Sequence, residues 1–124
     1  MGKWINLVVG GITGTVARYF LSGMVYQVFG TNFPYGTLAV NLIGCFVIGF
    51  LVTLADEKFL LDPNARLLLM AGFCGAFTTF STFMLETVNL MKEGENLRAF
   101  LNVGLSIVFG FLVFKTGVFL AEII

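Results

Sequence analysis

The residues of this sequence that could do chemistry lie inside long apolar segments. Residues 72–83 hold two glycines, four hydroxyl side chains and four phenylalanines. Glycine and β-branched hydroxyl residues weaken a helix, so this segment is predicted to interrupt the helix that contains it. Backbone carbonyls freed by such a break can hold an ion inside a membrane protein. The alternative is a continuous helix whose hydroxyls bond back to its own carbonyls.

Two other apolar segments carry polar and small side chains at helical spacing. Thr37 and Asn41 are four residues apart, and Asn102, Ser106 and Gly110 repeat at the same interval. Residues with this spacing share one face of a helix. Because a polar side chain is expensive in lipid, each is a candidate for a ligand or pore role. Asn41 is the strongest candidate, whereas Ser106 could instead bond back to its own helix.

Phe80 and Phe83 lie beside the hydroxyls of Ser81 and Thr82. The edge of a phenyl ring is electropositive, so two such edges could coordinate a small anion. The alternative is ordinary packing, since the chain has 15 phenylalanines. The charges agree with an anion path: Arg18 is the only charge in the first apolar segment, and Glu86 follows the hydroxyl-rich stretch.

The composition shows what must position these residues. Of the 124 residues, 58% are hydrophobic and 11% are charged, against about 25% charged in a soluble domain. We expect an all-α membrane protein of one domain, residues 1–124, because these runs are too continuous for the alternating strands of a barrel. The zero net charge and the absence of histidine argue against nucleic-acid binding and histidine-based catalysis. The predicted spans are residues 4–29, 35–55, 67–91 and 99–121.

The distribution of basic residues leaves the orientation nearly undetermined. Lysine and arginine are favoured on the cytoplasmic side, but both sides of the predicted bundle carry them. Lys3, Lys58, Arg66 and Lys115 are expected on the side of the termini, and Lys92, Arg98 and, if it sits past mid-span, Arg18 on the other. The chain could therefore insert in both directions and pair as an antiparallel homodimer. A weakly biased protein of single orientation is an equally open alternative.

Three ordered motifs resemble the CrcB/Fluc family of fluoride channels. They are residues 10–19 (GGITGTVARY), residues 34–44 (PYGTLAVNLIG) and residues 72–83 (GFCGAFTTFSTF). The resemblance implies a passive, fluoride-selective channel of the cell (inner) membrane that exports fluoride from the cytoplasm and so gives fluoride resistance. It also implies a dual-topology antiparallel homodimer with two pores, each lined by both copies, and neither enzymatic activity nor a nucleotide partner.

Carried over residue by residue, the resemblance assigns roles to the polar positions. Asn41 would contribute its amide to the anion path, Phe80 and Phe83 their ring edges, and Ser81 and Thr82 their hydroxyls. The interruption in the third span, in mid-membrane, would hold a structural Na⁺ through the main-chain carbonyls of Gly75 and Thr78 from both copies. Arg18 and Glu86 would lie at the vestibules. Asn102 and Ser106 complete the expected pore, although many members carry tyrosine where this chain has Asn102.

Two other classes of protein compete with this interpretation. A small dual-topology multidrug exporter would need a carboxylate in the middle of its first span, where this chain has only Arg18. A purely structural subunit of a membrane complex would leave Asn41 and the hydroxyl cluster without a purpose.

Overall fold

The computed structural model describes residues 2–124, and its regular secondary structure is all helical, with no strand in this part of the chain. Three long helices are α1 (Gly2–Phe29), α2 (Tyr35–Asp56) and α6 (Asn96–Glu122). A fourth long segment, Pro63–Lys92, is divided into α3 (Pro63–Arg66), the π-helix η1 (Leu67–Cys74), α4 (Gly75–Phe77) and α5 (Phe80–Lys92). All four segments are long and apolar enough to cross a membrane. The prediction of an all-α chain with four spans is confirmed.

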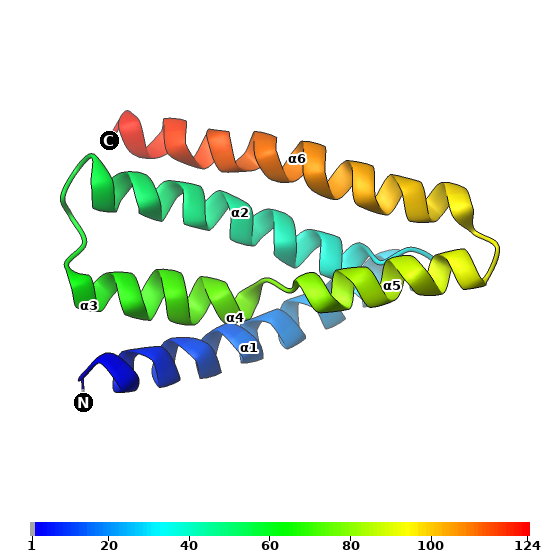
Figure 1. Cartoon of the computed structure of the whole chain (residues 1–124), viewed down its shortest axis with the longest axis horizontal. Helices are drawn as coiled ribbons and strands as arrows, with labels where there is room; N and C mark the ends of the chain where they lie inside the picture. The colour runs from blue at the N-terminus through cyan, green and yellow to red at the C-terminus, as the bar shows by residue number, and fades with distance from the viewer. Residues whose placement is uncertain (1) are drawn as a thin grey trace.

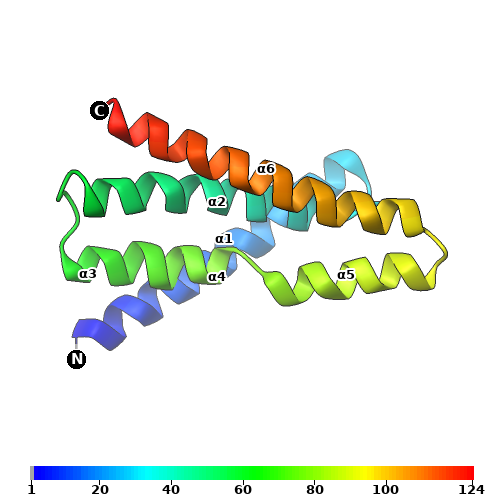
Figure 2. The same cartoon turned by 45° about the horizontal axis from the view of Figure 1, so that its top comes forward.

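The four segments run back and forth, so both termini lie at one end of the bundle (Figure 1). The connection between α2 and α3 lies at the same end, and the other two connections lie toward the opposite end. In both views α2 and α6 lie side by side, while α1 crosses the third segment at an angle (Figure 2). Several helices continue past the predicted spans; α6, for example, begins at Asn96 rather than at residue 99.

Glycines bring α2 and α6 into backbone contact. A Cβ added at Gly49 would overlap the carbonyl oxygen of Phe114, and one added at Gly117 would overlap that of Phe46. Each helix therefore presents a glycine to the backbone of the other, which is the small-residue packing typical of membrane helices. This pair of helices forms the wall on which the site described below is built.

The third segment begins at Pro63, four residues before the predicted span of residues 67–91. The side chain of Asp62 accepts a hydrogen bond from the backbone N–H of Ala65 at 2.7 Å, and Pro63 occupies the first helical position. The π-helix that follows has no counterpart among the sequence-based expectations. It places Gly72 against α1, where a Cβ on Gly72 would lie 3.0 Å from the Cα of Gly10.

Candidate functional site

The helical pattern of the third segment stops at Phe77 and resumes at Phe80. Between them, Thr78 (φ −95°, ψ 156°) and Thr79 (φ −148°, ψ 119°) have extended backbone. The hydroxyl of Thr78 bonds back to the Cys74 carbonyl at 3.0 Å, while the Thr79 hydroxyl accepts from the Thr82 N–H at 3.3 Å and caps α5. One hydroxyl thus completes the helix before the interruption and the other begins the helix after it.

Asn41, on α2, pairs with the extended backbone at two points. Its Nδ2 donates to the Thr79 carbonyl at 3.1 Å, and its Oδ1 accepts from the Thr79 N–H at 2.8 Å. These two bonds satisfy backbone groups that the interruption would otherwise leave unpaired. Because a side-chain amide has two N–H groups, one N–H of Asn41 remains for another acceptor.

The interruption also changes what the neighbouring carbonyls contact. In a continuous α-helix the Gly75 carbonyl would accept from the Thr79 N–H, and the Thr78 carbonyl from the Thr82 N–H. Here the Thr79 N–H donates to Asn41, and the Thr82 N–H donates to the hydroxyl of Thr79. The Gly75 and Thr78 carbonyls therefore lose the donors that a continuous helix would supply.

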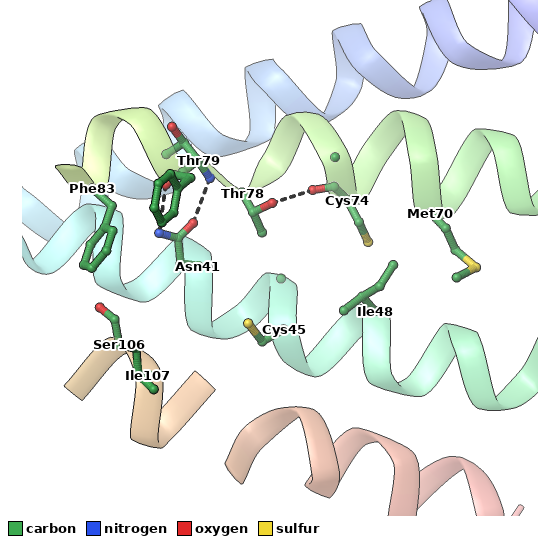
Figure 3. Close-up of a pocket in the computed structure, with 13 residues that line it drawn as sticks. Asn41, Cys45, Ile48, Met70, Cys74, Thr78, Thr79, Phe83, Ser106 and Ile107 are labelled. Atoms are coloured by element: carbon green, nitrogen blue, oxygen red, sulfur yellow. Dashed lines mark hydrogen bonds between the residues drawn. The ribbon is translucent and has the colours of Figure 1, made fainter. Parts of the chain in front are cut away.

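A groove of about 450 Å³ runs along the interruption between α2, the third segment and α6. Figure 3 shows Asn41, Phe83 and Ser106 converging on it from three different helices, with the Ser106 hydroxyl directed toward the Phe83 ring. The Ser106 Oγ is buried and has no hydrogen-bond partner within the described chain. It is thus a buried hydroxyl beside the groove whose hydrogen-bonding capacity the described residues leave unused.

The two phenylalanines predicted to meet an anion both line the groove, but they differ in environment. Their ring centroids lie 5.8 Å apart, with the ring planes at 52°. Phe83 is 7% exposed, whereas Phe80 is 73% exposed. The Phe83 ring is therefore packed into the wall of the groove, and most of the surface of the Phe80 side chain is left uncovered by the described residues.

Asn102 lies outside the groove. Its side chain is 1% exposed, and its Nδ2 donates to the Thr87 hydroxyl at 2.9 Å, which itself donates to the Phe83 carbonyl at 2.7 Å. This chain of hydrogen bonds ties α6 to α5. Sequence reasoning missed Thr87, because its position on the face of α5 toward α6 depends on the tertiary fold.

The remaining predicted positions are separated from the groove. Ser81 is exposed and Thr82 is half-buried, and neither lines it. Arg18 donates from Nε to the Ala76 carbonyl at 3.0 Å. Glu86 lies at a second cavity, of about 440 Å³, where its Oε2 accepts from the Tyr26 hydroxyl at 2.9 Å. Its Oε1 is buried and has no partner in the described residues.

Comparison with known proteins places this arrangement in a family. A family model described as "CrcB-like protein, Camphor Resistance (CrcB)" matches residues 5–118. The chain is 42% identical over 124 residues to a protein of Maridesulfovibrio salexigens, covering all of this chain and 98% of the relative. It is 49% identical over 108 residues to a protein of Geobacter sp. (87% of each chain), and 50% identical over 114 residues to one of Chlorobaculum tepidum (92% of this chain, 90% of the relative).

All three relatives carry the name "Fluoride-specific ion channel FluC". The likeness covers the three sequence motifs and all four helical segments. The chain is therefore a multi-pass protein of the cell membrane, and it belongs to the CrcB family.

Proposed function

We propose that this chain is a fluoride channel and that the groove beside the interruption is part of its conduction path. The observation that carries the proposal is the convergence of Asn41, Phe83 and Ser106 on one groove, together with the unpartnered hydroxyl of Ser106. The names of relatives at 40–50% identity support the same ion.

The chemistry of the groove suits a small, strongly hydrated anion. A pore must replace the water around such an ion with short-range donors and must not bind it so strongly that it cannot leave. The Ser106 O–H, the remaining N–H of Asn41 and the edge of the Phe83 ring supply neutral donors. The groove is lined by no charged side chain, so its attraction for fluoride is local and moderate.

We further propose that two copies pair in antiparallel orientation and form two pores. In one copy the groove is open and Phe80 is 73% exposed. A second copy would supply the missing wall and would cover this ring. The weak bias of lysine and arginine between the two ends of the bundle is compatible with insertion in both directions. The same proposal keeps Ser81, Thr82 and Asn102 as pore residues and Arg18 and Glu86 as vestibule residues, although none of these five side chains lines the groove of one copy.

A sodium ion at the centre of the dimer fits the donors that this chain offers. The Gly75 and Thr78 carbonyls have lost the amides that a continuous helix would provide, and oxygen-only, uncharged donors favour a hard cation over a transition metal. Residues 2–124 hold no cluster of histidine, cysteine or carboxylate side chains suited to a metal. When bound, Na⁺ would supply a positive charge that ties carbonyls of both copies together.

The proposed physiological role is passive export. Hydrogen fluoride enters a cell as a neutral weak acid and dissociates at the neutral internal pH, which traps fluoride inside. A membrane potential that is negative inside drives an anion outward through any passive path. A fluoride-selective channel therefore lowers internal fluoride without nucleotide hydrolysis or proton coupling.

The test is efflux from liposomes that contain only this protein, loaded with fluoride or with chloride. We expect fluoride efflux and little chloride efflux. Ser106→Ala should slow fluoride efflux about tenfold, corresponding to the loss of one hydrogen bond of about 1.4 kcal/mol in the path. Ser22→Ala is the matched control, because the Ser22 hydroxyl bonds back to the Tyr19 carbonyl at 3.3 Å. Chloride efflux equal to that of fluoride would contradict the proposed fluoride channel. Parent-like fluoride efflux from Ser106→Ala would contradict the proposed conduction path through the groove.

A further inference from the structure

A guanidinium from α1 compensates for part of the interrupted helix. The Ala76 carbonyl would accept from the Phe80 N–H in a continuous α-helix, but Thr78 and Thr79 are extended and the helical pattern is broken between the two residues. The Arg18 Nε donates to this carbonyl instead, at 3.0 Å. A cationic donor is well suited to the C-terminal end of a helix, where carbonyls are unpaired and the dipole is negative.

Two glycines bring Arg18 within reach of that carbonyl. Gly10, Gly14 and Arg18 are spaced four residues apart and share one face of α1. A Cβ added at Gly10 would overlap the Leu68 carbonyl oxygen, and one added at Gly14 would overlap that of Phe73. Backbone contact at these two turns sets the separation of α1 from the third segment, and Arg18 occupies the next turn along the same face.

We propose that Arg18 is a positioning residue that fixes the end of α4 and thereby holds the neighbouring Gly75 and Thr78 carbonyls in the arrangement that a cation requires. Two contacts from other helices and one within the third segment then hold the interruption. Arg18 holds the Ala76 carbonyl from α1, Asn41 holds Thr79 from α2, and the Thr79 hydroxyl caps α5. The effect of Arg18 on cation binding rests on the proposed function, whereas its effect on the end of α4 does not.

The experiment uses the purified full-length chain and four variants. Arg18→Met removes the donor and keeps most of the apolar length, and Arg18→Lys restores a cationic donor. Gly14→Ala keeps the Arg18 side chain but forces α1, and Arg18 with it, away from the Phe73 backbone. Gly11→Ala is the matched control, because a Cβ at Gly11 meets nothing within 4 Å.

Two readouts are independent of fluoride. Hydrogen exchange of the backbone amides in residues 76–83 reports how firmly the interruption is held. The thermal unfolding midpoint, measured in sodium against choline at equal ionic strength, reports cation binding to the folded chain. We expect Arg18→Met and Gly14→Ala each to speed hydrogen exchange in residues 76–83 at least tenfold. Each should also raise, at least tenfold, the sodium concentration that gives half of the full stabilisation. Arg18→Lys should recover part of both effects, and Gly11→Ala should behave as the parent does.

Parent-like exchange and parent-like sodium dependence in Arg18→Met would overturn the inference. If Arg18→Met fails to fold, Gly14→Ala and Arg18→Lys decide it by the same two readouts. If sodium does not stabilise the parent chain, the proposed sodium site fails, and the exchange rates alone decide whether Arg18 holds the interruption.

Discussion

Replacing Asn41 with aspartate tests the two-point contact between α2 and the interruption. Asn41→Asp keeps the size and shape of the side chain. It also keeps an oxygen that can accept from the Thr79 N–H, now 2.8 Å from Oδ1. The Nδ2 that donates to the Thr79 carbonyl at 3.1 Å is lost and replaced by a second oxygen. The substitution thus turns one of two hydrogen bonds into a contact between two acceptors.

The expected cost follows from that contact. Leaving a half-buried carbonyl without its donor costs about 1–3 kcal/mol of folding free energy, which should lower the thermal unfolding midpoint by several degrees. Because the Asn41 amide is proposed to contact the anion, a carboxylate at this position would lie about 4 Å from it and add a repulsion of about 4 kcal/mol at an effective dielectric constant of about 20. Fluoride efflux should therefore fall about 1,000-fold beyond any loss of folded protein.

The assay combines thermal unfolding over a range of pH with liposome efflux at neutral pH. A protonated carboxyl carries one O–H donor, which can restore the bond to the Thr79 carbonyl. The gap in unfolding midpoint between Asn41→Asp and the parent should therefore narrow as the pH falls and widen as it rises. A gap that is absent at neutral pH, or one that does not change on acidification, would refute the two-point contact as the reason for this asparagine.

Three further predictions concern the rings, the orientation and the cation. Phe80→Ile and Phe83→Ile should each abolish most fluoride efflux while changing the folding free energy by less than about 1.5 kcal/mol. Substitution by methionine should have a milder effect at both positions. Parent-like efflux from both isoleucine variants would show that the two rings serve packing and do not contact the anion. Several lysines added to one connection should force the chain into one orientation. Each such variant should be inactive alone but active when mixed with a variant of opposite bias. Full activity from a single orientation would exclude the antiparallel dimer. Gly75→Pro should abolish the stabilisation by sodium, whereas Thr78→Ser should keep it. Anomalous scattering should find an ion at the carbonyls of these two residues. Equal sodium dependence in both variants would contradict ligation by the main chain.

The sequence predicted the elements well because their signals are local. The long apolar runs define the four spans, and Asp62 followed by Pro63 marks a helix start without reference to the rest of the chain. The weak helix formers between Gly72 and Phe83 likewise point to the segment in which Thr78 and Thr79 are extended.

The partners of the polar side chains could not be predicted in the same way. Asn41 is conspicuous in the sequence, but its contact with Thr79 spans 38 residues and exists only after α2 packs against the third segment. The Asn102 side chain shares a helical face with Ser106, yet burial against α5 directs it to Thr87. The π-helix at Leu67–Cys74 carries no recognisable sequence signal.

The paired glycines of α2 and α6 have a mechanical consequence. Gly49 faces the backbone at Phe114, and Gly117 faces the backbone at Phe46, so the two contacts fix the helices at two points along their length. Sliding either helix by one residue would drive a larger side chain into the opposite backbone at both points, and rotating either helix would do the same. The two helices should therefore move together as one rigid body. A motion that opens or narrows the groove would therefore have to displace the third segment relative to this pair of helices.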